Sequence, residues 1–464
     1  MSKKNNSFFK KLNSFKNNIA LILEDNKLIT YNELLLKTKK ISKKIEKQKK
    51  LVFLLGQNNL ETIAAYISFI DKGHTVAFLD FRINAIFLKS LIKIYNPSYI
   101  FCEKKIKKVN SYNPILNFKS YILYKRKKDI RNVLNKELML LMSTSGTTGS
   151  PKFVRQSYAN VDFNTKTIIK YLKIKSEDIT ITTLPISYVY GLSVINTHLQ
   201  AGATIVLTNY SMVEKKFWEL IKKHKVNNFS GVPYNYSIIE KIFKKGLPNS
   251  LKYTTQAGGK MNQILLRKII NVYKKNKIKL IQMYGAAEAT SRMSYLKWKF
   301  AEEKIGSIGK PIPGGLFYLI DTKGKKINKK GELVYKGKNV SMGYAENLKD
   351  LSLPDINKSI LKTGDIAYKD KDGFYYIEGR KDRYMKIYGI RVNLSELETI
   401  LSKKGIDVIM KEGEENKINI YFKNSSKIND GIRYISKITS INSKVFLSKI
   451  LSKKNLTNNL KYKI

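Results

Sequence analysis

Short apolar runs alternate with segments of helical periodicity along most of the first 290 residues, and this alternation constrains the fold more than any other feature. Leu51–Leu55 (LVFLL) is typical of a buried strand, the apolar residues of Leu60–Ile70 recur at helical spacing, and Thr75–Asp80 (TVAFLD) is strand-like again. Further strand-like runs, separated by helical stretches, occupy Leu138–Met142, Ile179–Leu184, Thr204–Leu207, Asn228–Gly231 and Leu280–Met283. Such alternation predicts an α/β fold with a largely parallel sheet and helices on its faces. Ligands of these sheets bind beyond the carboxyl ends of the strands.

The character of the sequence changes after about Gly306. Short segments such as GELVYKG and GFYYIEGR lie between glycines and prolines, which predicts a small β-rich subdomain. Ser395–Glu398 (SELE) then has the pattern of a capping box, and it predicts that a helix begins there within a small α+β unit at the C-terminal end. With 464 residues the chain is long enough for two or three domains.

Composition narrows the functional class. The net charge is +51, but only ten of the 87 basic residues are arginines and the lysines spread along the whole chain. Proteins that recognise nucleic acids favour arginine, because its planar guanidinium forms two parallel hydrogen bonds, so we expect no specific nucleic-acid partner. The sequence contains no run of about 18 apolar residues and no signal-like apolar segment, which predicts no membrane span and no secretion. The one cysteine, Cys102, points to a reducing, cytoplasmic location.

A loop rich in glycine and hydroxyl side chains follows the strand-like run that ends near Met142. Its sequence is STSGTTGSPK, from Ser143 to Lys152. Loops of this composition hold phosphate, because glycines let backbone N–H groups approach the anion closely. The common P-loop spacing is absent, since Ser150 and Pro151 separate the last glycine from the lysine. The loop therefore predicts a phosphate site of another kind.

Further segments give the loop a context. The sequence continues with QMYGAAEAT (Gln282–Thr290), KTGDIAY (Lys362–Tyr368) and GRKDRYMKIYGIRVNLSELE (Gly379–Glu398), in that order. Together with STSGTTGSPK they resemble the adenylate-forming superfamily of acyl-CoA synthetases, amino-acid and aryl-acid activating domains and luciferases. LITYNELL, LPISYVYGLSV, FSGVPYNY, TQAGGKM, GSIGKPIPGG and GELVYKGKNVSMGY extend the resemblance over nearly the whole chain.

The resemblance implies a reaction and its partners. ATP and a carboxylic acid would give acyl-AMP and pyrophosphate with Mg²⁺ as cofactor. The acyl group would then pass to coenzyme A or to the phosphopantetheine of an acyl carrier protein. It also implies a large ATP- and acid-binding domain, residues 1–380, and a small mobile domain, residues 381–464, that swings about a hinge at Asp382. Charge stabilisation on the triphosphate matters more for the first step than acid–base help.

Residue roles follow from the same resemblance. Lys152 is expected on the departing phosphates, Glu288 on Mg²⁺ and Tyr284 against the adenine ring, while Asp365 would accept both ribose hydroxyls. A carboxylate suits Mg²⁺, a hard cation. The other residues expected at the nucleotide are Ser145, Gly146, Thr147, Thr148, Gly149, Gly258, Gly285 and Arg380.

In the small domain the resemblance places Gly389 beside the pantetheine arm and Arg391 next to it in the interface. The family also carries a C-terminal lysine that bridges the acyl oxygens and the α-phosphate. The expected Gly-Lys pair is absent from LTNNLKYKI, so Lys461 is the best substitute and Lys463 the second. Ala287 is a further departure, because the family usually has a hydroxyl side chain just before the metal-binding carboxylate.

The acid pocket is expected between an aromatic pair, Tyr188 and Tyr190, and walls formed by Phe229, Gly231, Val232, Ala257, Gly258 and Gly259. Amino-acid activating enzymes carry an aspartate where this chain has Gly191. Burying an ammonium group without that counter-charge is costly, which favours a plain carboxylic acid. Two alternatives stay open: an amino-acid activating enzyme, and a degenerate homologue that binds adenylate or a carrier protein without catalysis.

Overall fold

The computed structural model describes residues 8–104, 111–128, 133–143, 152–242, 246–380, 384–388, 390–402 and 404–450. Two compact units make up the chain. The larger consists of Met1–Ile83, Leu88–Thr144 and Pro151–Gly379, and the smaller is built mainly from Arg380–Ile464. The predicted hinge residue, Asp382, lies outside the described residues, and the predicted domain division stays a prediction.

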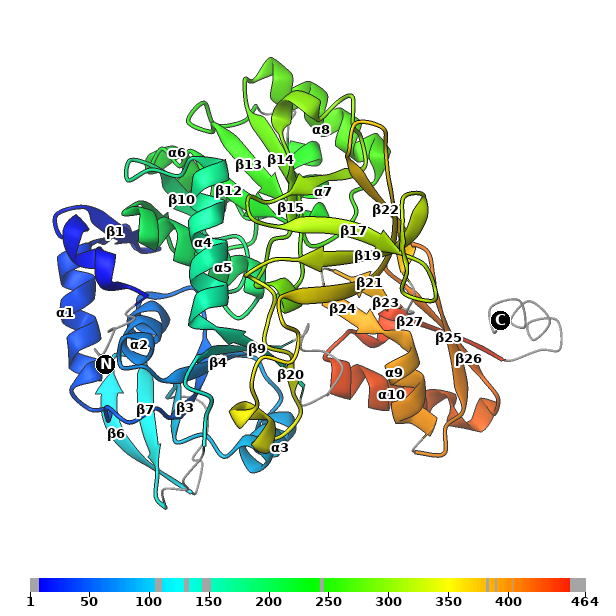
Figure 1. The fold of residues 1–464 in the computed structure, drawn as a ribbon. Coiled ribbons are helices and arrows are strands. Elements are labelled where there is room, and N and C mark those ends of the chain that lie inside the picture. Colours follow the sequence, from blue (N-terminus) through cyan, green and yellow to red (C-terminus); the bar gives the residue numbers. More distant parts are fainter. Residues whose placement is uncertain are drawn as a thin grey trace. The chain divides into compact units, whose positions relative to one another are not determined.

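The first sheet of the larger unit contains 14 strands within the described residues (Figure 1). Its middle part, from β1 to β14, is parallel apart from the β1–β2 pair, and the strands from β14 onward pair antiparallel. Across the sheet the order is β18 (Lys326–Ile327), β17 (Leu316–Ile320), β19 (Lys330–Lys336), β21 (Ile360–Lys369), β22 (Tyr375–Arg380), β16 (Ser307–Pro311), β15 (Ser294–Leu296), β14 (Lys279–Tyr284), β13 (Tyr253–Gln256), β12 (Asn228–Gly231), β10 (Ile179–Ile181), β11 (Thr204–Val206), β1 (Ile19–Ile22) and β2 (Leu28–Thr30).

The second sheet has eight strands and a parallel centre, β8–β4–β3–β5. The predicted parallel α/β pattern is therefore confirmed, but it is divided between two sheets, because the chain turns back antiparallel after β8 and closes the second sheet on that side. Its order is β20 (Tyr344–Ala345), β9 (Phe153–Ser157), β8 (Leu138–Ser143), β4 (Thr75–Asp80), β3 (Leu51–Gly56), β5 (Tyr99–Glu103), β7 (Tyr121–Arg126) and β6 (Tyr112–Phe118).

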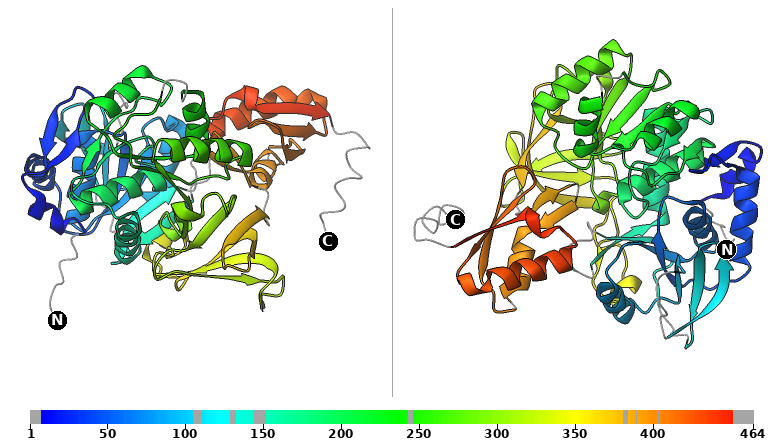
Figure 2. Two further views of the ribbon diagram at one scale, coloured as in Figure 1. Left: turned by 90° about the horizontal axis from the view of Figure 1, so that it is seen from above. Right: turned by 180° about the vertical axis from the view of Figure 1, so that it is seen from behind.

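Helices pack on both sheets. Helix α2 is buried from Leu60 to Ile70, and it shares one apolar cluster with α5 and with strands of both sheets. Because this helix is buried over nearly its whole length, it needs this position between layers. Helices α6, α7 and α8 cover another face of the first sheet, as Figure 2 shows from two further sides. The bounds are α1 (Tyr31–Ser42), α2 (Leu60–Asp71), α3 (Ala85–Tyr95), α4 (Tyr158–Leu172), α5 (Val189–Ala201), α6 (Lys215–Lys223), α7 (Pro233–Ile242) and α8 (Gln263–Lys275).

The smaller unit is α+β with its own apolar core. It comprises β23 (Tyr384–Ile387), β24 (Ile390–Asn393), α9 (Leu394–Ser402), β25 (Val408–Glu412), β26 (Ile418–Phe422), α10 (Ile428–Thr439) and β27 (Phe446–Ile450). The predicted helix at Ser395–Glu398 is present as α9, but Ser395 lies inside the helix rather than at its N-cap. Helix α9 begins at Leu394, and Oδ1 of Asn393 accepts a hydrogen bond from the backbone N–H of Glu396. Asparagine is a strong N-cap residue, and the helix starts at the first suitable acceptor.

None of the helices in the described part of the chain combines the length and the apolar character that crossing a bilayer requires.

Candidate active site

Lys152 directly precedes strand β9, and it lies against an aromatic residue from a distant part of the chain. The short strand β20 pairs antiparallel with β9, with Tyr344 opposite Val154. This pairing brings the ammonium nitrogen of Lys152 to 3.9 Å from the centroid of the Tyr344 ring. The same nitrogen is 3.5 Å from Oε1 of Glu346. A cation over an aromatic face is attracted by the ring quadrupole, so Tyr344 positions Lys152.

Glu288 lies on the other side of Tyr344. It belongs to a 3-10 turn, η3 (Ala287–Ala289), and its Oε1 accepts a 2.8 Å hydrogen bond from the Tyr344 hydroxyl. Two hydrogen bonds of 2.8 Å hold this turn. Gln156 Nε2 donates to the Ala287 carbonyl, and the backbone N–H of Ser341 donates to the Glu288 carbonyl. The Glu288 side chain is buried. Lys152, Tyr344 and Glu288 thus form one continuous set of contacts.

Arg155 holds the segment that carries Tyr344. It lies in β9, is 0% exposed, and its guanidinium donates to four backbone carbonyls rather than to a carboxylate. These acceptors are Tyr344 (3.0 Å), Leu353 (2.6 Å), Met342 (2.7 Å) and Pro354 (3.1 Å). The planar guanidinium of Arg155 therefore provides hydrogen-bond donors to the carbonyls of a loop that has little regular structure.

A second polar pair joins Tyr284, the last residue of β14, to Asp365 in β21. The Tyr284 hydroxyl donates a short hydrogen bond to Oδ2 of Asp365. The carboxylate is buried, and its backbone N–H donates to Thr363 Oγ1 at 3.1 Å. Gly285 has to follow Tyr284, because a Cβ there would lie 1.7 Å from the carbonyl oxygen of Ser291, where the loop folds back.

An apolar cluster near the carboxyl ends of β12 and β13 contains Val232 and Ala257 of the expected acid-pocket walls, together with the expected aromatic pair Tyr188 and Tyr190. Its members are Leu184, Tyr190, Val194, Val232, Ala257 and Met283, with Tyr171, Tyr188, Ile281 and Tyr295 packed against them. Phe229 is not among them, since it packs in the cluster that α6, α7 and α8 cover. Gly258 has φ +82°, and a Cβ there would lie 3.0 Å from the Tyr188 hydroxyl. This turn therefore favours glycine.

Arg292 is a buried cation in this cluster that sequence reasoning missed. Its guanidinium carbon lies 3.8 Å from the centroid of the Tyr190 ring, and its Nε donates to Met283 Sδ at 3.3 Å. The Tyr190 hydroxyl donates to the Thr255 carbonyl at 2.9 Å, and burial raises the pKa of this phenol. No local pattern in the sequence pointed to Arg292, because its partner Tyr190 lies about 100 residues earlier in the chain.

The donor set fits an ATP–Mg²⁺ ligand in three respects. Glu288 is one buried carboxylate, connected to Lys152 through Tyr344, which suits a metal that binds through one or two carboxylates plus phosphate oxygens. Within the described ranges no group of three or more metal-binding side chains exists, so an all-protein cage is not formed there. Asp365 is a buried acceptor beside an aromatic ring, as a ribose site needs.

The remaining predicted residues have no described side chains. Ser145, Gly146, Thr147, Thr148 and Gly149 lie outside the described residues, as do Gly389, Lys461 and Lys463. Arg380 ends β22 and Arg391 lies in β24, and their roles stay predictions.

Comparisons with known proteins agree with this geometry. The model of the family described as AMP-binding enzyme matches residues 8–345. The 2-succinylbenzoate–CoA ligase of Bacillus licheniformis is 28% identical over 277 residues, 59% of this chain and 56% of that protein. The corresponding ligase of Bacillus subtilis is 30% identical over 264 residues, 56% of this chain and 52% of that protein. The chain thus spans about half the length of the curated relatives it matches.

Solved structures show the same fold over a longer stretch. A double mutant of the o-succinylbenzoate CoA synthetase of Bacillus subtilis, bound to a product analogue, has a TM-score of 0.77 at 21% identity, with 97% of each chain covered. The structure of IdnL1 has a TM-score of 0.77 at 14% identity, covering 96% of this chain and 98% of that one. At these identities the likeness shows the fold alone.

Proposed function

The chain belongs to the family of AMP-binding enzymes, and from this premise we propose that it is an ATP-dependent acid–thiol ligase. In the first step a carboxylate oxygen of the acid attacks the α-phosphorus of ATP, and the bond to the β-phosphate breaks to give acyl-AMP and pyrophosphate. In the second step a thiol attacks the acyl carbon, a thioester forms, AMP leaves and the thiol proton goes to solvent. We place the protein in the cytoplasm, in keeping with its one cysteine, Cys102, which is buried.

The observation that carries this proposal is the contact series Lys152–Tyr344–Glu288 together with the Tyr284–Asp365 pair. The ammonium group of Lys152 would stabilise the negative charge of the departing pyrophosphate. Glu288 would hold Mg²⁺, which neutralises charge on the phosphate oxygens when it is bound. Asp365 would accept the ribose hydroxyls, and the Tyr284 ring would lie against the adenine.

A plain carboxylic acid is the proposed substrate class. Gly191 leaves no side chain to pair with an α-ammonium group, and a Cβ at this position would lie 2.2 Å from the Pro185 carbonyl oxygen. The backbone itself therefore resists the aspartate that an amino-acid activating enzyme would need. The matching relatives are named as ligases of 2-succinylbenzoate and coenzyme A, so this acid and this thiol are the first pair to test.

The test is ATP–pyrophosphate exchange with labelled pyrophosphate across 2-succinylbenzoate, benzoate, short and long fatty acids and the 20 amino acids. We expect exchange with at least one plain acid and with none of the amino acids. Thioester formation from the active acid and coenzyme A, followed by mass spectrometry, tests the second step. A Glu288→Gln variant is the matched inactive control, because it keeps the size of the side chain and removes its charge. Exchange with amino acids alone would contradict the proposed substrate class.

A second function is favoured by one observation, namely that Ala287 stands where the family usually has a hydroxyl. Its carbonyl accepts from Gln156, and its methyl group cannot donate to an α-phosphate. Loss of one charge-assisted hydrogen bond costs about 1.5–3 kcal/mol. A homologue that binds adenylate without catalysis would bind AMP and show no exchange with any acid. An Ala287→Thr variant that gains exchange at least tenfold would show that the missing hydroxyl limits the rate.

A further inference from the structure

We propose that a pocket at the amino ends of β13 and β14 binds a small phosphorylated molecule, at the strand ends opposite to the Tyr284–Asp365 pair of the proposed adenylate site. The aromatic wall of this pocket also packs against the apolar cluster of the expected acid pocket. Tyr253 and Lys279 are the first residues of these two parallel strands and stand opposite each other in the sheet. Tyr284 and Gly258 lie at or beyond the other ends of the same strands. Six residues of β14 span about 16 Å, so the two places are at opposite edges of the sheet.

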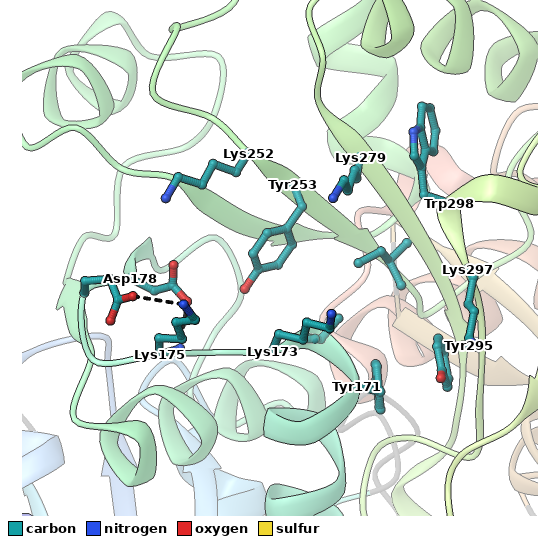
Figure 3. Close-up of a pocket in the computed structure, with 13 residues that line it drawn as sticks. Tyr171, Lys173, Lys175, Asp178, Lys252, Tyr253, Lys279, Tyr295, Lys297 and Trp298 are labelled. Atoms are coloured by element: carbon teal, nitrogen blue, oxygen red, sulfur yellow. Dashed lines mark hydrogen bonds and ion pairs between the residues drawn. The ribbon is translucent and has the colours of Figure 1, made fainter.

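The pocket has a volume of 390 Å³, which lies in the range of small-molecule sites. Five lysines line it, two from the segment after α4 and three from the starts or ends of β13, β14 and β15: Lys173, Lys175, Lys252, Lys279 and Lys297. Two carboxylates also line it, which leaves an excess of three positive charges. Figure 3 shows Lys252 and Lys279 on one side of Tyr253 and Lys173 and Lys175 on the other.

The two carboxylates already have partners. Asp178 Oδ2 accepts from the backbone N–H of Lys175 and Oδ1 accepts from Asn227 Nδ2, both at 2.9 Å. Glu177 is 3.4 Å from the ammonium of Lys175. The other four lysines have no carboxylate partner among the residues that the structure describes. Their charge is therefore available to an anion.

A buried donor supplies a second, independent indication. The hydroxyl of Tyr253 is buried, and it has no hydrogen-bond partner in the described part of the chain. An unsatisfied buried polar group is rare, because its desolvation is not compensated. Burial raises the pKa of this phenol, so its proton is kept and can be donated. Figure 3 shows the ring of Tyr253 extending into the pocket, with its hydroxyl pointing toward the segment that carries Lys173 and Lys175.

The opposite wall is aromatic and apolar. Tyr171 and Tyr295 stack with ring centroids 4.1 Å apart and an interplanar angle of 11°, and Ile281 and Trp298 complete this side. Among the residues that the structure describes, no arginine lines the pocket. Lysine binds phosphate as a point charge, whereas the forked recognition of carboxylates is the work of arginine. The chemistry therefore favours a phosphorylated compound with a flat or apolar body.

Intrinsic fluorescence can report on this pocket alone. The chain has two tryptophans, Trp218 and Trp298, and only Trp298 lines the pocket. In a Trp218→Phe background, UMP serves as the probe and uridine as the matched compound without phosphate. We expect UMP to quench Trp298 saturably and uridine to have no effect at equal concentration. Equal responses to the two compounds would overturn the proposal.

Variants then test the residues. Lys252→Ala/Lys279→Ala should weaken UMP binding roughly tenfold or more, because two of the charges that face the phosphate are removed. The matched control Lys323→Ala/Lys325→Ala removes two exposed lysines from the turn between β17 and β18 and should change affinity less than about twofold. Equal weakening by both pairs would show that only the overall charge matters, and it would overturn the assignment.

Tyr253→Phe separates binding from folding. The variant removes an unpaired buried hydroxyl, so the melting temperature of the free protein should stay the same or rise. UMP affinity should nevertheless fall about five- to tenfold, because one hydrogen bond to the phosphate is lost. Unchanged UMP affinity in this variant would contradict the proposal. Asp365→Asn should leave the Trp298 titration unaltered, whatever its effect on adenylation.

Discussion

The hydroxyl of Tyr344 donates a 2.8 Å hydrogen bond to Oε1 of Glu288, while the face of the same ring carries the ammonium group of Lys152 at 3.9 Å. One tyrosine thus positions both charged groups that the proposed adenylation needs. Without this ring the ammonium group of Lys152 would keep only its contact with Glu346, whose side chain is exposed.

Tyr344→Phe tests this relationship. The variant keeps the ring beneath Lys152 and removes the donor to Glu288, so we expect ATP–pyrophosphate exchange to fall roughly tenfold, as for the loss of one hydrogen bond to a charged group. Tyr344→Ala also removes the cation–π contact and should fall further. Tyr318→Phe is the matched control, since the Tyr318 hydroxyl makes no hydrogen bond within the described residues. If Tyr344→Phe exchanged at the rate of the unaltered protein, the hydrogen bond would have no catalytic importance.

Asp365→Asn should weaken nucleotide binding most strongly. Two hydrogen bonds from ribose hydroxyls to a charged acceptor contribute about 1.5–3 kcal/mol each, so we expect AMP affinity to drop at least about 100-fold by calorimetry. Tyr284→Phe keeps the aromatic face and removes the hydroxyl that donates to Asp365, and its effect should be several times smaller. If Tyr284→Phe had the larger effect on AMP affinity, the Asp365 carboxylate would act by orienting Tyr284 rather than by binding the ribose.

Arg155→Met should destabilise the larger unit. It leaves four carbonyls without their donor in a site that is 0% exposed, so the free energy of unfolding should fall by about 3–5 kcal/mol in urea titrations. Arg155→Lys should recover little of the lost free energy of unfolding, because an ammonium group cannot donate in the several directions that the planar guanidinium covers. Arg267→Met on the exposed side of α8 is the control and should change stability by no more than about 0.5 kcal/mol. Equal stability of the two methionine variants would show that the loop is held by other contacts.

Acid should destabilise the protein partly through His74. Burial lowers the pKa of this imidazole from 6.5 to about 4, and Nδ1 accepts a hydrogen bond from the Lys50 N–H at 3.0 Å. Between pH 6.5 and 4 the unfolded chain binds the proton more readily than the folded protein, so stability falls as the pH falls through this window. The contribution is about 3 kcal/mol.

His74→Asn keeps an acceptor near the Lys50 N–H and removes the titrating ring. Urea titrations at several pH values should show that the difference in stability between pH 7 and pH 4 shrinks by about this contribution. Parallel curves for the two proteins would contradict the assignment. The carboxylates titrate in both proteins and cancel in the comparison.

The sequence predicted those elements whose signal is local. The strand–helix alternation that begins at Leu51 reappears as β3, α2 and β4. Tyr344 was not predicted as a site residue, because β20 has only two residues and its pairing with β9 joins segments about 190 residues apart. Such a strand has no periodicity of its own, and its position depends on the tertiary contacts that Arg155 supplies.

Arg155 itself illustrates the same limit. All five residues of β9 are buried, so the alternation of polar and apolar side chains that marks a half-exposed strand is missing. The buried guanidinium is tolerated only because a distant loop offers carbonyls to it. Arg292 and Tyr344 were missed for the same reason, since each contact depends on partners that no local pattern reveals.

Gly191 provides the last prediction, and it separates two explanations of the missing aspartate. If the substrate alone decided the residue, Gly191→Asp would fold normally and would gain exchange with amino acids. The backbone argues otherwise, because any Cβ would lie 2.2 Å from the Pro185 carbonyl oxygen and 2.9 Å from that of Leu184. We expect both Gly191→Asp and Gly191→Ala to lose about 3 kcal/mol of stability, and we expect neither to activate an amino acid.

Gly379→Ala is the matched control for stability, because a Cβ there has no neighbour within 4 Å among the described residues and φ is not positive. Urea titration should leave it close to the unaltered protein. A stable Gly191→Asp variant that exchanges with amino acids would show that the substrate, and not the backbone, determines the residue at this position. If both Gly191 variants were unstable while Gly379→Ala was normal, the turn that leads into α5 would require glycine at position 191. This requirement would then be a structural reason for the preference for plain acids.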